Sequence, residues 1–166
     1  MIPLIILAVL ANIFAQEDCP KLDSYYIIGN YKACVSYKQE LMSPRCRYVK
    51  ALCSMANSDY DTAKFEFSVI GAELKKAGGM KELNGLSLLS MAEALFMSGE
   101  FAKARSLSSE LNALLSKKMP YSYPYFVSEV LLSRSYLNSF DITSAQKRLA
   151  LAKAAGMEDL LCASIE

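Results

Sequence analysis

The chain has 166 residues, of which 53% are hydrophobic and 21% charged, so it is long and apolar enough for one domain with a core. Eighteen basic and 17 acidic residues leave a net charge of +1, which offers no electrostatic basis for binding nucleic acid. The sequence contains no histidine. This excludes Ser-His-Asp and Cys-His nucleophiles and histidine-ligated zinc. Catalysis by carboxylates or lysine on a helical scaffold is the remaining alternative, but no motif in the sequence supports it. We expect no catalytic residues, no cofactor and no metal ion, and we do not expect an enzyme.

Residues 1–15 form an apolar segment without a charged side chain, followed by the polar residues Gln16-Glu17-Asp18. An apolar stretch that ends on a small residue is typical of a secretory signal, here cleaved after Ala15. The segment is too short for a membrane span, which needs about 20 apolar residues. The alternative is a buried N-terminal helix that covers the first helical unit. The first interpretation predicts the secretory pathway and the second predicts the nucleus or cytoplasm, with residues 16–166 as the helical domain in both.

Apolar residues at helical spacing occur along most of the remaining chain, and turn or capping residues separate them. Near its start the chain has a turn at Gly29-Asn30, and Ser43-Pro44 breaks the pattern there. In chain order, the predicted helical stretches are 21–42 (two short helices about the turn), 45–55, 60–74, 86–96, 101–114, 125–137 and 142–155, with a short capping helix at 157–165. No segment predicts a strand.

The five cysteines are Cys19, Cys34, Cys46, Cys53 and Cys162, and they include no CxxC pair. This scatter argues against a zinc site and against a dense disulfide scaffold. Cys46 and Cys53 are two helical turns apart, on one face of a helix but too far apart to bond each other. We predict that most cysteines are buried free thiols that pack as small apolar residues. The alternative is a disulfide such as Cys19–Cys34, which requires an oxidising compartment.

A large apolar residue stands three positions before a small one at four places, Tyr31/Cys34, Tyr60/Ala63, Phe101/Ala104 and Ile142/Ala145. The later copies follow in equal steps, from position 60 to 101 and from 101 to 142, whereas the step from 31 to 60 is shorter. Each copy has one helical stretch before it and another running through it. This pattern predicts helix-turn-helix repeats in which the small residue lets two helices approach and the large one fills the wedge between neighbouring pairs.

These units resemble tetratricopeptide (TPR) repeats over roughly residues 20–155. The matching residues are Gly29, Asn30 and Tyr31 in the first unit, Ala51, Asp59, Tyr60, Ala63 and Phe67 in the second, Ala92, Gly99, Phe101 and Ala104 in the third, and Ser133, Ile142, Ala145 and Leu149 in the fourth. TPR units usually repeat every ~34 residues, so the spacings here imply one shortened unit and long loops. The resemblance implies an all-α, right-handed array of antiparallel helix pairs, a TPR-like α-solenoid of about four units that serves as a protein–protein interaction scaffold.

A narrower resemblance, carried by residues 46–53 with Tyr60 and Ala63, is to the N-terminal repeats of TPR subunits of the anaphase-promoting complex. It implies a structural subunit of a large assembly, in which the N-terminal apolar segment is an ordinary repeat helix. Those subunits are much longer than this chain. A secreted or ER-lumenal TPR-like protein of unknown role is a further alternative.

TPR arrays usually bind a peptide or partner helix along the concave face formed by the first helix of each unit. The resemblance therefore implies a protein or peptide partner and a set of contact residues taken from that face and from an aromatic connection: Arg45, Tyr48, Glu93, Phe96, Arg134, Asn138, Tyr121 and Tyr123. Two structural alternatives stand beside this interpretation. Glu93 pairs with an arginine such as Arg134, and the aromatic connection folds back to seal the gap between the third and fourth units.

The residues Arg45, Arg47 and Lys50 flank Tyr48 and form a small basic patch. In a chain of nearly neutral charge this pattern is more typical of a solvated helix face than of a nucleic-acid site. We expect no nucleic acid among the partners.

Overall fold

The computed structural model describes residues 19–38, 42–77, 82–120 and 122–154. This part of the chain is all-helical, with eight helices and no strand. The helices are α2 (Pro20–Ile27), α3 (Tyr31–Ser36), α4 (Pro44–Ala56), α5 (Tyr60–Lys76), α6 (Glu82–Met97), α7 (Phe101–Lys118), α8 (Tyr123–Leu137) and α9 (Ile142–Ala154). The all-α prediction is confirmed. The second helix predicted within 21–42 is shorter than expected and ends at Ser36, because the backbone of Tyr37 is extended, whereas α6 and α7 are longer than predicted. The predicted segments 1–15 and 157–165 lie outside the described residues.

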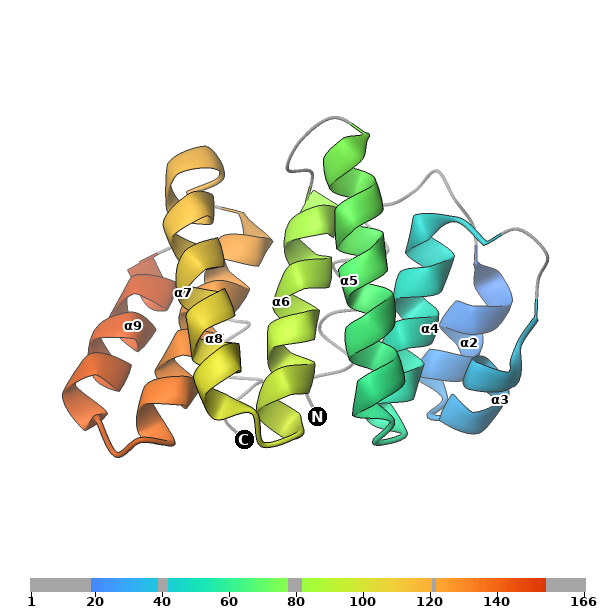
Figure 1. Cartoon of the computed structure of the whole chain (residues 1–166), viewed down its shortest axis with the longest axis horizontal. Helices are drawn as coiled ribbons and strands as arrows, with labels where there is room; N and C mark the ends of the chain where they lie inside the picture. Colours follow the sequence, from blue (N-terminus) through green and yellow to red (C-terminus); the bar gives the residue numbers. More distant parts are fainter. Residues whose placement is uncertain (1–18, 39–41, 78–81, 121, 155–166) are drawn as a thin grey trace.

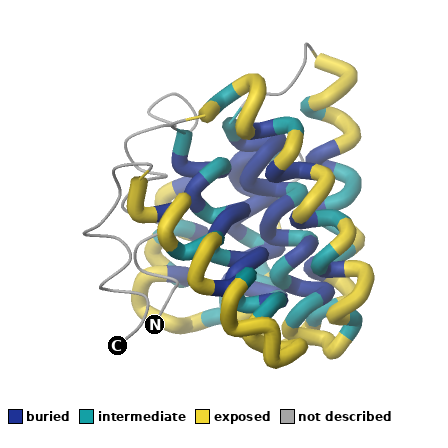
Figure 2. The backbone as a smooth tube through the Cα atoms, turned by 90° about the vertical axis from the view of Figure 1, so that its left-hand side faces the viewer, coloured by how far each residue is buried: buried dark blue, intermediate teal, exposed yellow. Residues whose placement is uncertain are grey.

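The helices form a row that runs from α2 and α3 at one end to α9 at the other (Figure 1). Each helix packs against the next one in the chain. In addition, each even-numbered helix contacts the next even-numbered one, α2 with α4, α4 with α6, and α6 with α8. Buried residues lie between the helices and exposed residues at the outer edges and turns (Figure 2). Both the consecutive helices and the even-numbered helices therefore connect the row.

One backbone conformation recurs in the turns that connect α2 with α3, α4 with α5, α6 with α7, and α8 with α9. Each contains a residue in the left-handed region, namely Gly29 (φ 73°), Ser58 (φ 63°), Gly99 (φ 86°) and Phe140 (φ 59°). The N–H of the following residue donates to the carbonyl five positions earlier, in the pairs Asn30–Tyr25, Asp59–Ser54, Glu100–Leu95 and Asp141–Tyr136. This is the bond of a Schellman helix ending. The sequence repeat thus corresponds to one turn structure used four times.

The small residue of each copy is buried in the second helix of its pair, with Cys34 and Ala63 at 0%, Ala104 at 1% and Ala145 at 2% exposure. Their small side chains allow the close helix approach that the sequence predicted. The large residue differs from the prediction, because Phe101 is 41% and Ile142 60% exposed. Each is the first residue of its helix, beside the turn, and does not fill a wedge between pairs.

The prediction of free thiols is wrong for four of the cysteines. Cys19 is bonded to Cys46 and Cys34 to Cys53, and the alternative pair Cys19–Cys34 does not form. The physical reason is the packing of α2 and α3 against α4, which places one cysteine of each short helix unit opposite a cysteine of α4. Helices of only 8 and 6 residues bury little surface of their own, so these cross-links compensate for a small interface.

Candidate partner-binding site

The structure brings three of the predicted contact residues together on α6 and α8. Arg134 Nη1 lies 3.2 Å from Glu93 Oε1, and the guanidinium lies over the Phe96 ring, 5.2 Å from its centroid. The Arg134 side chain is 31% exposed and that of Glu93 is 13% exposed. The ion pair predicted as the structural alternative for Glu93 is thus confirmed. We call Glu93, Phe96 and Arg134 the Arg134 cluster; it presents a cation, a carboxylate and an aromatic ring at a partly exposed position.

Phe96 also links the cluster to the neighbouring turn. Its ring meets the Phe101 ring edge to face at a centroid distance of 5.1 Å. Asn138, a further predicted residue, is exposed and caps α8, where its N–H donates to the carbonyl of Arg134. Arg134 and Asn138 are therefore one helical turn apart at the end of α8. Among the predicted residues that the structure describes, the cluster and Asn138 remain at least partly accessible.

Tyr48 and Tyr123 belong to the interior instead. Tyr48 is 1% exposed, and its hydroxyl lies 2.9 Å from Ser90 Oγ on α6. Tyr123 is 6% exposed and stacks on Phe126 at 6.2 Å. The predicted role of these two tyrosines in contacting a partner does not fit their burial. Tyr121 lies outside the described residues, whereas Tyr123 and Phe126 pack in the main apolar core.

The buried tyrosines have perturbed acidities. Burial, followed by the negative charge of Glu93, raises the pKa of Tyr123 to about 12. Burial likewise raises the pKa of Tyr26 and of Tyr48, and the charge of Glu93 contributes to both shifts. These tyrosines come from α2, α4 and α8, and Glu93 comes from α6. Glu93 therefore acts electrostatically on residues of all three other even-numbered helices.

The basic patch on α4 is not a solvated face. Arg45 is 8% exposed and its Nη2 donates to Asp23 Oδ2 on α2 over 2.8 Å. Arg47 Nη2 lies 3.1 Å from Glu66 Oε2 and Nη1 lies 2.9 Å from Glu73 Oε2, both on α5. Lys50 Nζ donates to the carbonyl of Tyr37 over 3.0 Å. The side chains of this patch tie α4 to neighbouring segments, which corrects the predicted solvated face and removes Arg45 from the accessible contact residues.

A cavity of about 480 Å³ lies beside this patch, where α3, α4 and α5 meet. Its lining is mixed in charge and contains Val35, Met42, Arg47, Lys50, Ala51, Ser54, Asp59, Thr62 and Glu66. Because Arg47 and Lys50 already bind protein acceptors, the cavity offers no uncommitted cation to an anionic ligand. It does not define a ligand class.

Within the described residues, no group of histidine, cysteine or acidic side chains is placed to hold a metal ion. Across the same part of the chain, no helix combines the length and apolarity that crossing a bilayer requires. No family model, curated protein or solved structure matches this chain. Its function therefore has to be inferred from its own residues and contacts.

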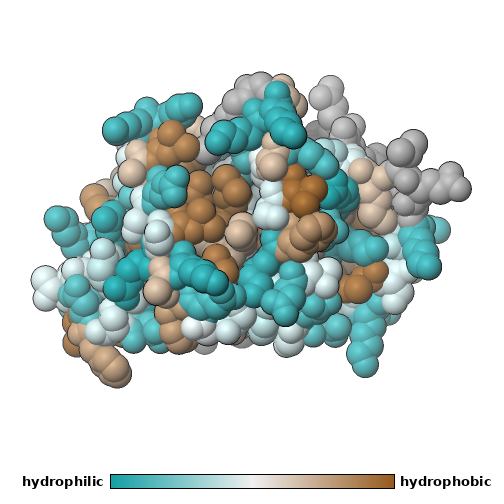
Figure 3. Space-filling model, viewed as in Figure 1, coloured by the Kyte–Doolittle hydropathy of each residue, from teal (hydrophilic) through white to brown (hydrophobic). Residues whose placement is uncertain are grey.

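Sequence reasoning missed Phe140, which is 91% exposed and has a left-handed backbone at the turn between α8 and α9. Its neighbours Leu137 and Ile142 are 52% and 60% exposed. On the face seen in Figure 3, the apolar surface forms separate patches among hydrophilic side chains. The signal in the sequence was a bulky aromatic residue at the repeat position that Gly99 occupies in the preceding unit.

Proposed function

We propose that this protein is a non-enzymatic interaction scaffold, a right-handed TPR-like array of about four antiparallel helix pairs that binds a segment of a partner protein. Two features support this architecture. A residue in the left-handed region and the same backbone hydrogen bond occur in all four turns. The even-numbered helices contact one another along the row, as the first helices of stacked repeats do.

The observation that carries the proposal is the Arg134 cluster. Arginine and aromatic residues are enriched among the few residues that dominate binding energies. Here the Arg134 guanidinium is positioned by both the Phe96 ring and the Glu93 carboxylate, and about a third of the side chain is exposed at 31%. Such a preorganised guanidinium loses little conformational entropy when a partner binds. Because Glu93 already balances its charge, the cluster suits a partner segment that packs an apolar or aromatic surface beside Phe96 and accepts a hydrogen bond from Arg134.

The experiment compares capture of partners by the immobilised full chain and by three variants, Arg134→Ala, Phe96→Ala and Lys147→Ala. Lys147 is exposed on α9 and serves as the matched loss of a cation away from the cluster. We expect the wild type and Lys147→Ala to capture the same proteins. The two cluster variants should capture at least about tenfold less of them, with helix content unchanged. Equal capture by all four proteins would exclude the cluster as the binding site.

The two disulfides support a secreted or ER-lumenal scaffold over a subunit of the anaphase-promoting complex. Disulfides persist in oxidising compartments and are rare in the nucleus and cytosol. The bonds Cys19–Cys46 and Cys34–Cys53 join the first three described helices. N-terminal sequencing of the native protein tests this assignment. A start at Gln16 would support secretory entry, whereas a retained residue 1 with co-purification of the complex would overturn it.

A further inference from the structure

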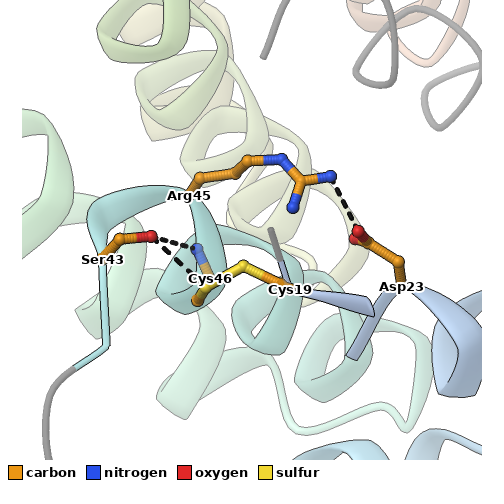
Figure 4. Close-up of a disulfide and its surroundings, with 5 residues drawn as sticks. All are labelled: Cys19, Asp23, Ser43, Arg45 and Cys46. Atoms are coloured by element: carbon orange, nitrogen blue, oxygen red, sulfur yellow. Dashed lines mark hydrogen bonds and ion pairs between the residues drawn. A yellow bond between two sulfur atoms is a disulfide. The ribbon is translucent and has the colours of Figure 1, made fainter. Parts of the chain in front are cut away.

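The two disulfides attach α2 and α3 to α4. Cys19–Cys46, which we call the outer bond, joins the N-terminal ends of two helices, whereas Cys34–Cys53, the inner bond, joins the C-terminal ends of two helices. In the outer bond, Cys19 is the N-cap of α2 and Cys46 is the third residue of α4 (Figure 4). In the inner bond, both cysteines lie in the last turn of their helices. The carbonyl of Cys34 accepts from the N–H of Tyr37, and that of Cys53 from the N–H of Asn57.

This difference determines how well each sulfur would carry a negative charge. The N-terminal end of a helix is partially positive and lowers the pKa of a cysteine thiol, whereas the C-terminal end is partially negative. The hydroxyl of Ser43, the N-cap of α4, also donates to Cys46 Sγ over 3.3 Å. Upon cleavage of the outer bond, this hydroxyl and the helix end would both stabilise a Cys46 thiolate.

The nearby Arg45–Asp23 ion pair does not offset this effect. The Arg45 guanidinium extends toward Asp23, and the two groups form an ion pair at 2.8 Å (Figure 4). A closely paired cation and anion largely cancel each other at a distance. This ion pair therefore leaves the effect of the helix end and the Ser43 hydroxyl on Cys46 largely unchanged.

The outer bond is also slightly more exposed to solvent than the inner bond. Cys19 and Cys46 are each 5% exposed, whereas Cys34 and Cys53 are each 0% exposed. Thiol–disulfide exchange requires a thiolate to reach one sulfur, and a leaving thiol of low pKa departs faster. Both requirements favour the outer bond.

We propose that Cys19–Cys46 is a thiol-exchange site, which a dithiol reductant opens while Cys34–Cys53 stays closed. A thiolate of the reductant attacks Cys19 Sγ, forms a mixed disulfide and displaces Cys46 as a thiolate. The second thiol of the reductant then attacks the reductant's first sulfur atom in the mixed disulfide and displaces Cys19 as a thiolate. The reductant leaves as a disulfide, the protein gains two electrons, and two protons convert the thiolates into thiols.

The opened state is local. The Asp23–Arg45 ion pair still connects α2 to α4, and the inner bond still holds α3 to α4. Reduction at this site therefore releases the covalent tie at the start of α2 without detaching the helix pair.

The test exposes the oxidised full chain to limiting dithiothreitol, quenches samples with N-ethylmaleimide and maps alkylated cysteines by mass spectrometry. The proposal expects Cys19 and Cys46 to be labelled about tenfold faster than Cys34 and Cys53. Labelling of both pairs at equal rates, or of the inner pair first, would overturn it.

The Ser43→Ala and Ser43→Thr variants separate the proposed cause from simple fraying. Ser43→Ala removes the hydroxyl that stabilises the leaving thiolate, so outer-bond reduction is expected to slow, whereas Ser43→Thr keeps a hydroxyl and the wild-type rate. Faster reduction of Ser43→Ala would indicate that opening of the helix end controls the rate, and would contradict the proposed mechanism.

Discussion

Arg134 and Glu93 occupy the same position of successive helix pairs, 41 residues apart in the sequence, and bind each other over 3.2 Å. Gly99 and Phe140 are separated by the same step and adopt the same left-handed turn conformation. Opposite charges one sequence step apart thus link α6 to α8. The same arginine lies over Phe96 and remains partly exposed, so one residue connects the packing of the units with the proposed partner site.

The Glu93–Arg134 pair is expected to contribute modestly to stability. Because Arg134 is 31% exposed and Glu93 13%, solvent screens much of the attraction, and we expect a coupling of about 0.5–1 kcal/mol. Urea unfolding of Glu93→Gln, Arg134→Gln and the double variant measures this coupling. Arg134→Lys is the control that keeps the charge but loses the planar contact with Phe96. Additive effects of the two single changes would show that the residues do not interact.

Replacing Phe140 by glycine is expected to stabilise the protein. Glycine adopts the left-handed backbone at φ 59° without strain, whereas it adds entropy to the unfolded chain. The relief of strain is the larger effect, so we expect the free energy of unfolding to rise by about 0.5–1 kcal/mol. The Phe140 side chain is 91% exposed and forfeits little packing. Thermal unfolding measures the change, and Gly99→Ala at the equivalent turn is the control that should destabilise. A lower melting temperature for Phe140→Gly would reveal a stabilising contact of the ring.

Alkaline pH is expected to unfold the protein through its buried tyrosines. The pKa of Tyr123 rises from 10.0 to about 12 on folding, chiefly by burial, so the folded state favours the neutral phenol. Its contribution to stability is complete below pH 10.0 and is lost as the pH rises toward about 12. Burial raises the pKa of Tyr26 and Tyr48 in the same direction.

Tyrosinate absorbance and circular dichroism, recorded together against pH, test this expectation. A fraction of the 10 tyrosines should ionise only as helix content falls. Tyr123→Phe should shift that transition toward higher pH, because it removes one group whose ionisation drives unfolding. Ionisation of every tyrosine near pH 10.0 with the helices intact would contradict the burial of these phenols.

Removal of either disulfide is expected to destabilise the first helix pair. The bonded cysteines are separated by 27 and 19 residues, and cross-links of this span typically contribute about 3 kcal/mol. Urea unfolding of Cys19→Ala/Cys46→Ala and of Cys34→Ala/Cys53→Ala compares the two. Because α2 and α3 are short, we expect protease sensitivity to appear first in this region. Wild-type stability in either double variant would show that packing alone holds the pair.

The helices could be predicted from the sequence because their signals are local. Ser43-Pro44 before α4, Asn57-Ser58-Asp59 before α5 and Ser98-Gly99 before α7 specify where helices begin and end through backbone geometry and capping. The repeat was also visible, since a large apolar residue followed three positions later by a small one recurs at the start of α3, α5, α7 and α9. The Glu93–Arg134 pair followed from this periodicity, because equivalent positions of adjacent units lie close together.

The cysteine pairing and the burial of the predicted contact residues depended on tertiary structure. Spacing along the chain does not show which helix packs against which, so Cys19 and Cys34 could not be assigned to Cys46 and Cys53. Tyr48 and Tyr123 had the amphipathic chemistry of surface anchors, yet packing between even-numbered helices buried them. Local sequence thus determined where the helices and turns lie. Long-range packing alone decided which side chains are cross-linked, which are buried, and which three stay available at the Arg134 cluster.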